Sequence, residues 1–238
     1  MSTDKNVEFE FNRSFEGPDG ESTYYIINPT AKDIRGADWE YSKTYTKSLV
    51  EGITTVAEMT DILMVRGIIG PEFDQRSNEL TRILAEKVEI LEATSDIDKK
   101  ADAAVAVAIA REELFQWNQR LNAPLANTCE QISDDMRLEY LTSSIILNED
   151  GSRVWSDFDS YLVGKDQGLA QKARFEVMLL LQGLDSSFLE NTPEAVAMRE
   201  VETDAINSIT KKDSTSGSKV KKAKPEGKKG SKKSSKTK

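Results

Sequence analysis

Residues 1–29 alternate apolar and polar side chains as β-strands do. In the segment VEFEFN, Val7, Phe9 and Phe11 are separated by acidic or polar residues, a period of two that is typical of a half-buried strand. The turn sequence GPDG follows at residues 17–20, and the β-formers of STYYIINP come next. We therefore predict a β-hairpin over residues 1–29. An isolated hairpin is marginally stable, so it must pack on the rest of the chain or pair with another chain.

After Pro29 the apolar spacing changes to three and four residues, which indicates helices. Thr30 can cap the first helix, and Gly52 ends it. Thr55 and Glu58 then form a capping box for a short second helix that ends at Gly67. The predicted apolar stripe of the first helix consists of Ile34, Ala37, Tyr41, Tyr45 and Leu49.

The same spacing predicts further helices as far as residue 209. One begins at Pro71, a long one covers residues 102–121, another follows Pro124, and the last begins at Pro193. The short segment WSDFDSYLVG, residues 155–164, is not assigned to a helix or to a strand. The predicted stripes are Leu80, Leu84, Val88 and Leu91; Val107, Ala110, Leu114, Trp117 and Leu121; Ile132, Met136 and Tyr140; Leu169, Ala173, Val177, Leu180 and Leu184; and Met198, Val201, Ala205 and Ile209.

Together these patterns predict a mainly α protein with a small N-terminal β-hairpin (1–29), a multi-helix domain of about seven helices (30–210) and a disordered basic tail (211–238). The alanine-rich start of the helix at 102–121 allows a neighbouring helix to approach closely. That neighbour can belong to the same chain or to a second copy. The sequence is therefore compatible with a dimer or a small ring as well as with packing inside one chain.

Charge is distributed unevenly along the chain. Residues 211–238 contain 12 lysines against Asp213 and Glu226, which leaves 20 basic and 39 acidic residues, a net charge of −19, for residues 1–210. The tail has almost no apolar residues, so it cannot offset the entropy of ordering, and we expect it to be disordered. Its candidate contacts to a partner or to nucleic acid are Lys219, Lys221, Lys222, Lys224, Lys228, Lys229, Lys232, Lys233, Lys236 and Lys238.

The residue types limit the chemistry that is expected. The chain has no histidine, which excludes histidine-based nucleophiles, general bases and zinc ligands. Acidic pairs such as Asp134–Asp135 point apart on a helix, and no glycine loop is suited to phosphate. We therefore expect no enzyme activity, catalytic residue, metal or cofactor. A single cysteine, Cys129, and the lack of a long apolar stretch favour a cytoplasmic protein that does not enter a membrane.

Two tryptophans are the candidate protein-interface residues. Trp39 lies off the stripe of its helix, so it is expected to cover the hairpin or to contact another subunit. Trp117 lies on the stripe of the helix at 102–121, where core packing is the simpler interpretation.

One segment resembles a known family. The stretch YYIINPTAKDIRGADWEYSKTYTKSLVEGITTVAEMTDILMVRGI, residues 24–68, has a strand, a PT helix start, an aromatic-rich helix, a GIT break and a short helix ending in RGI. This order is similar to that of small helical accessory proteins of tailed bacteriophages, described as tail assembly chaperones or related morphogenesis factors. The resemblance implies a non-enzymatic assembly factor that binds phage tail or other virion proteins through helical surfaces, in the host cytoplasm or in the virion.

Two other functions remain open from the sequence. The protein could be nucleic-acid-associated, with the lysine tail as a non-specific anchor, or it could be a structural component of the virion whose hairpin adds a strand to a neighbour's sheet.

A salt titration tests the tail. Full-length protein should bind duplex DNA weakly at low salt, without regard to base sequence, and should lose that binding near physiological salt, because lysine–phosphate contacts are weakened by competing ions. A variant that lacks residues 211–238 should not bind. Tight, salt-resistant binding that survives the deletion would contradict this account of the tail.

Overall fold

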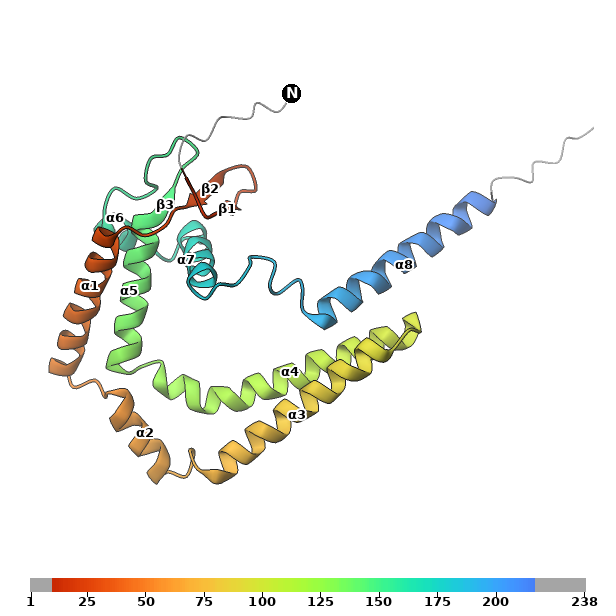
Figure 1. Ribbon diagram of the computed structural model, residues 1–238, viewed down its shortest axis with the longest axis horizontal. Coiled ribbons are helices and arrows are strands. Elements are labelled where there is room, and N and C mark those ends of the chain that lie inside the picture. The colour runs from red at the N-terminus through yellow and green to blue at the C-terminus, as the bar shows by residue number, and fades with distance from the viewer. Residues whose placement is uncertain (1–9, 217–238) are drawn as a thin grey trace, which may run out of the picture.

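The computed structural model describes residues 10–216, which form eight helices and a small antiparallel sheet (Figure 1). The expected fold class, mainly α with a small N-terminal hairpin, is confirmed over these residues. The helices are α1 (Ala31–Val50), α2 (Val56–Val65), α3 (Pro71–Ala93), α4 (Ile97–Leu125), α5 (Cys129–Ile145), α6 (Phe158–Gly164), α7 (Gly168–Leu181) and α8 (Pro193–Ser216), and the strands are β1 (Arg13–Glu16), β2 (Thr23–Ile26) and β3 (Ile146–Leu147). None of the helices in residues 10–216 is both long and apolar enough to cross a membrane.

The elements form two groups that meet where α4 leads into α5 (Figure 1). The sheet packs with α5 and α7, helices α1 and α6 pack on α5, and we call this group the sheet lobe. Helices α3, α4 and α8 pack against one another, and we call this group the arm. The chain enters the arm through α2, returns at α5, and reaches the arm again at α8, so neither group is a continuous segment.

The sheet has the strand order β1–β2–β3, with both pairs antiparallel. The turn of the hairpin lies where it was predicted, and the Gly17 N–H donates to the Ser22 carbonyl over 2.7 Å. The first strand, however, was predicted over residues 7–12 and instead covers Arg13–Glu16, with Phe15 buried. Residues 10–12 lie outside the strand, and residues 1–9 lie outside the described residues.

The third strand was not predicted. Helix α5 passes directly into β3, where Ile146 pairs with Ile26 and Leu147 with Tyr25. The hairpin therefore does not form a unit of its own. It shares a core with α5 and α7, made of the buried residues Phe15, Ile26, Ile145, Ile146, Ala173 and Val177.

The helix starts at α1 and α2 follow the sequence closely. Thr30 and Asp33 form a capping box at α1, and Thr55 and Glu58 form another at α2. The open segment WSDFDSYLVG contains α6, which is capped by Asp157. The helix predicted over residues 102–121 is longer than expected, since α4 begins at Ile97 and continues through Pro124 to Leu125.

The arm confirms close packing along the alanine-rich half of α4. Ala104 and Val107 of α4 are buried against Leu91 of α3 and Ala197 of α8. The predicted stripe of α8 is therefore wrong at this point, because Ala197 faces the core while the neighbouring Met198 is exposed. Helix α8 also continues to Ser216, past the domain boundary predicted at residue 210. Residues 217–238 of the predicted tail lie outside the described residues.

Helices α1 and α5 pack along each other, and one close approach sets their spacing. The ring of Tyr140 on α5 lies directly over Gly36 on α1, where an added Cβ would be 2.2 Å from the Tyr140 hydroxyl. The ring cannot turn away freely because Phe158 of α6 packs edge-on against it at 5.2 Å between centroids. Only glycine fits at position 36 in this arrangement.

Gly36→Ala should therefore destabilise the protein. Overpacking costs about 1–3 kcal/mol, which exceeds the gain of about 1 kcal/mol expected when alanine replaces glycine within a helix. Chemical denaturation measures the difference. In a Tyr140→Ala background the same substitution should be neutral or stabilising, and Gly164→Ala, whose nearest contact is an ordinary 3.6 Å, serves as the control. Equal effects of Gly36→Ala in the two backgrounds would contradict the close approach.

Candidate partner-binding groove

Of the residues that the sequence singled out, the structure describes only Trp39 and Trp117, which lie on different helices. The ten lysines from Lys219 to Lys238 lie outside the described residues. Trp39 projects from α1 with 70% of its surface exposed, so it does not cover the hairpin as one of the two expectations had it. Its predicted contact with another subunit stays a prediction.

Trp117 is engaged within the arm. Its ring stacks on Phe73 of α3 at 5.2 Å between centroids, and its indole N–H donates to the Phe73 carbonyl over 3.4 Å. The guanidinium of Arg120 also lies over the Trp117 ring, 4.8 Å from its centroid. These contacts support the core-packing interpretation of Trp117 rather than an interface.

A groove lies between α5 and α7 in the sheet lobe. Two adjoining cavities of about 530 and 360 Å³ share four wall residues and together form what we call the α5–α7 groove. Volumes of this size are typical of ligand sites. The walls are Gln131, Asp134, Asp135, Arg137, Leu138, Glu139 and Leu141; Tyr161, Lys165 and Asp166; and Gln171, Arg174, Phe175, Met178, Leu181 and Gln182.

One half of the groove is charged. Lys165 Nζ lies 3.6 Å from Glu139 Oε1, and Arg174 Nη2 lies 2.8 Å from Asp135 Oδ1. Between these pairs Tyr161 is fully buried. Burial raises the pKa of Tyr161 to about 12, helped by the negative charge of Glu139 and opposed by Arg174. The phenol is therefore neutral at ordinary pH.

The other half of the groove is apolar. Leu138, Leu141, Met178 and Leu181 line it together with Asp134, Arg137 and Gln182, so it is mainly rather than wholly apolar, and Leu181 has 52% of its surface exposed. Phe175, 39% exposed, lies on the wall of the charged half. An exposed apolar strip beside charged groups is a common feature of surfaces that bind other proteins.

Two buried polar atoms in the charged half have no hydrogen-bond partner. They are Glu139 Oε2 and Arg174 Nε, and no other buried side-chain nitrogen or oxygen atom of the described residues is in this condition. Buried polar atoms are ordinarily bonded, so these two atoms are exceptions within the described residues.

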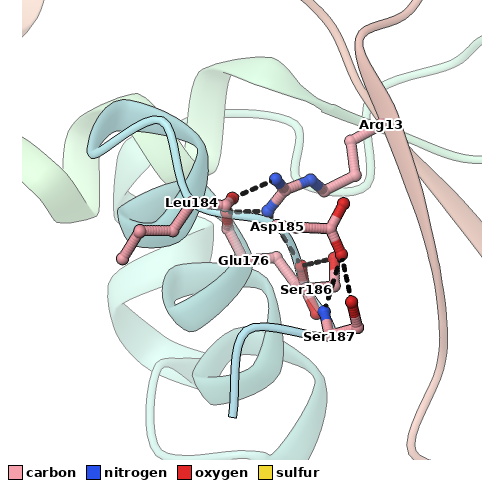
Figure 2. A network of polar contacts seen from close by, with 6 residues as sticks. All are labelled: Arg13, Glu176, Leu184, Asp185, Ser186 and Ser187. Carbon is pink, nitrogen blue, oxygen red and sulfur yellow. Dashed lines mark hydrogen bonds and ion pairs between the residues drawn. The ribbon is translucent and has the colours of Figure 1, made fainter. Parts of the chain in front are cut away.

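The groove wall depends on a polar clamp that fixes α7 (Figure 2). The Arg13 guanidinium of β1 reaches Glu176 of α7, with Nη1 lying 3.4 Å from Oε2, and Nη2 donates to the Leu184 carbonyl. Ser186 Oγ donates to the same carboxylate over 2.8 Å. Beside it, hydrogen bonds from Ser187 hold the pKa of Asp185 below its ordinary value. The clamp ties the edge strand of the sheet to the end of α7.

Helix α7 uses two different faces. Ala173, Glu176 and Val177 face the sheet, while Arg174, Phe175 and Met178 face α5 across the groove. Only the first face was predictable from the sequence, since Ala173 and Val177 form an apolar stripe. The groove residues of α5 also recur at spacings of three and four, but most are charged or polar, and such a face is ordinarily exposed to solvent.

Helix α5 begins at Cys129, the single cysteine. It is fully buried, and its thiol lies 3.1 Å from the Ile53 carbonyl, so it packs α5 against the turn before α2. Burial raises the pKa of the Cys129 thiol. These features support a structural role for Cys129.

No group of three or more potential His, Cys, Asp or Glu metal ligands occurs within the part of the chain that the structure describes. Comparison with protein-family models, with curated proteins and with solved structures finds no match to this chain.

The clamp leads to a stability prediction. Arg13→Met leaves the buried Glu176 carboxylate without its cation, and removing one partner of a buried pair costs about 3 kcal/mol or more. Denaturant unfolding should show this loss, while Lys43→Met, which removes an exposed partner of Glu40, should cost less than about 1 kcal/mol. Adding Glu176→Leu to Arg13→Met should recover part of the stability. If Arg13→Met costs no more than Lys43→Met, the clamp does not hold α7.

Proposed function

We propose that the protein is a non-enzymatic assembly factor of a tailed bacteriophage, similar to a tail assembly chaperone, and that it binds tail or other virion proteins through its helical surfaces. The α5–α7 groove is the observation that carries this proposal. It lies between two helices and combines an apolar half with a charged half. Grooves of this kind accept an amphipathic helix or an extended segment of another protein.

The arrangement of residues 24–68 adds support. The strand β2, the capped helix α1, the break at Gly52 and the capped helix α2 follow one another in the order on which the resemblance rests. The charge of the body supports the same function, because a net charge of −19 over residues 1–210 keeps a protein and its complexes soluble and repels nucleic acid.

Each of two alternative functions is favoured by one specific observation. The lysine cluster of residues 211–238 favours a nucleic-acid-associated protein. The outer edge of β1, which no described strand covers, favours a virion structural component that adds its sheet to a neighbour's. The acidic body weighs against the first, and the short length of β1 weighs against the second.

The test of the proposed function begins with the neighbouring genes and continues with their products. We expect genes for tail tube and tape-measure proteins beside this gene. When they are co-expressed with the tagged protein, at least one tail protein should be retained. Leu181→Glu, which places a charge in the apolar half of the groove, should reduce that retention at least tenfold, because it removes a contact worth about 1.4 kcal/mol or more.

Val163→Glu is the matched control, since Val163 is 91% exposed and is not part of the groove wall. It should leave retention unchanged. A neighbourhood of replication genes, no retained tail protein, or equal retention with Leu181→Glu and Val163→Glu would each overturn the proposal.

A further inference from the structure

The outer side of α1 carries basic residues on both sides of an exposed tryptophan. Trp39 keeps 70% of its surface exposed, and four exposed bases share its side of the helix: Lys32, Arg35, Lys43 and Lys47. Residues three, four, seven or eight positions apart lie on one side of a helix, so these five side chains follow one line along α1. We call them the basic stripe.

Little within the chain neutralises the basic stripe. Lys43 and Lys47 lie 3.2 and 3.8 Å from glutamates of the same helix, and ion pairs of exposed lysines are worth less than about 1 kcal/mol each. Arg35 Nε donates to the Ala31 carbonyl over 3.1 Å, and neither Arg35 nor Lys32 forms an ion pair within residues 10–216. The stripe is therefore available to a partner that carries negative charge.

The outer side of α4 has the opposite charge. Its inner side packs against α3 and α8, which leaves the outer side to solvent. There Val105 and Ile109 keep 51% and 56% of their surface exposed. Exposed carboxylates lie before and after this aliphatic pair: Asp102, Glu112 and Glu113. We call these five residues the acidic face of α4.

The basic stripe and the acidic face match in order and in length. Each has an apolar centre between charged ends. At a rise of 1.5 Å per residue, Arg35 and Lys43 are about 12 Å apart along α1, and Asp102 and Glu112 are about 15 Å apart along α4. The long, flexible stems of lysine and arginine accommodate that difference. Both surfaces are exposed in the single chain, where α1 belongs to the sheet lobe and α4 to the arm (Figure 1).

A second copy of the chain fits the stripe better than an extended anionic surface such as DNA or a bilayer. Such a surface also meets the acidic residues around the stripe, since residues 1–210 carry a net charge of −19. A helix is only about 10–12 Å wide, so it covers the stripe alone. Charges more than about 8 Å away are largely screened at physiological salt.

We propose that the basic stripe of α1 docks on the acidic face of α4 of a second copy of this chain. Trp39 packs on Val105 and Ile109, and the bases on either side of it pair with the carboxylates. Because the two surfaces lie on different helices, the contact occurs twice in a two-fold dimer or repeats from copy to copy in a ring. This inference goes beyond the proposed function, because it involves neither the α5–α7 groove nor a virion protein.

Charge reversal on each surface tests the docking in the full-length protein. The α1 variant combines Arg35→Glu with Lys43→Glu, and the α4 variant combines Asp102→Lys with Glu112→Lys. Sedimentation velocity over a range of concentrations should show that the wild type associates. Each variant should raise the apparent dissociation constant at least tenfold, because like charges then face each other. An equal mixture of the two should associate as the wild type does, because the reversed α1 meets the reversed α4.

A control variant separates docking from general repulsion between acidic chains. Arg66→Glu with Lys87→Glu changes two exposed bases outside both surfaces and alters the net charge as the α1 variant does. It should leave association unchanged. The α4 variant makes the chain less acidic, so general repulsion alone would strengthen its association, whereas docking predicts a weaker one. Circular dichroism and thermal unfolding check that each variant is folded.

Several results would overturn the inference. They are a wild type that stays monomeric, association that survives either reversal, and a mixture of folded variants that does not associate. Loss of association in the α4 variant alone would indicate that the lysines of residues 211–238, and not α1, contact the acidic face. Association that neither reversal changes would indicate the edge of β1. Retention of tail proteins is measured separately, so failure of the proposed function is distinguishable from failure of this inference.

Discussion

The sheet lobe depends on the point where α5 passes into β3 without a loop. Ile145 ends the helix, Ile146 begins the strand, and both side chains are completely buried. Pairing of Ile146 with Ile26 joins the middle of the chain to the strand that precedes α1. Because α1 in turn packs along α5, the pairing closes a circuit of β2, α1, α5 and β3. Burial of the three isoleucines, at about 1.5–3 kcal/mol each, makes this circuit a major source of stability.

The circuit also determines where the groove can form. Once α5 is fixed by its strand, α7 packs on the same core through Ala173 and Val177. The Arg13–Glu176 clamp then sets the end of α7, as Figure 2 shows. The side of α7 that remains faces α5 at a distance that leaves room for an occupant. The groove is thus a consequence of two helices being held by their other faces.

Features that depend on local sequence were predictable. The capping boxes of α1 and α2 need only two residues three positions apart, and the hairpin turn needs only its four residues. Strand β1 was misplaced because the apolar alternation of Val7, Phe9 and Phe11 is interrupted at Arg13, so the pattern does not reach Phe15, the residue that is buried in the strand. Strand β3 was missed because Ile145 and Ile146 follow one another without a break, so the apolar pattern of the helix appears to continue into the strand.

The groove was not predictable from the sequence for a different reason. Asp135, Glu139 and Arg174 have the spacing and charge of residues on a solvated helix face, and only the packing of α7 opposite α5 brings them to one groove. That packing depends on contacts between two helices that lie far apart in the sequence. The error in the predicted apolar stripe of α8 has the same origin. Ala197 rather than Met198 is buried because it packs against α4, a contact that no local pattern in the sequence indicates.

Packing within the arm also determines which surfaces remain for self-association. The alanine-rich face of α4, which suited a second copy of the chain, is covered by α3 and α8, with Ala104, Val107 and Ala110 buried. The ion pairs Arg111–Glu194 and Lys100–Glu200 lie at the edge of this contact. Exposed pairs contribute little, so close packing of small side chains holds α8 in place. The expectation of a dimer or ring then rests on the outer edge of β1, on Trp39 and on the opposite, acidic face of α4.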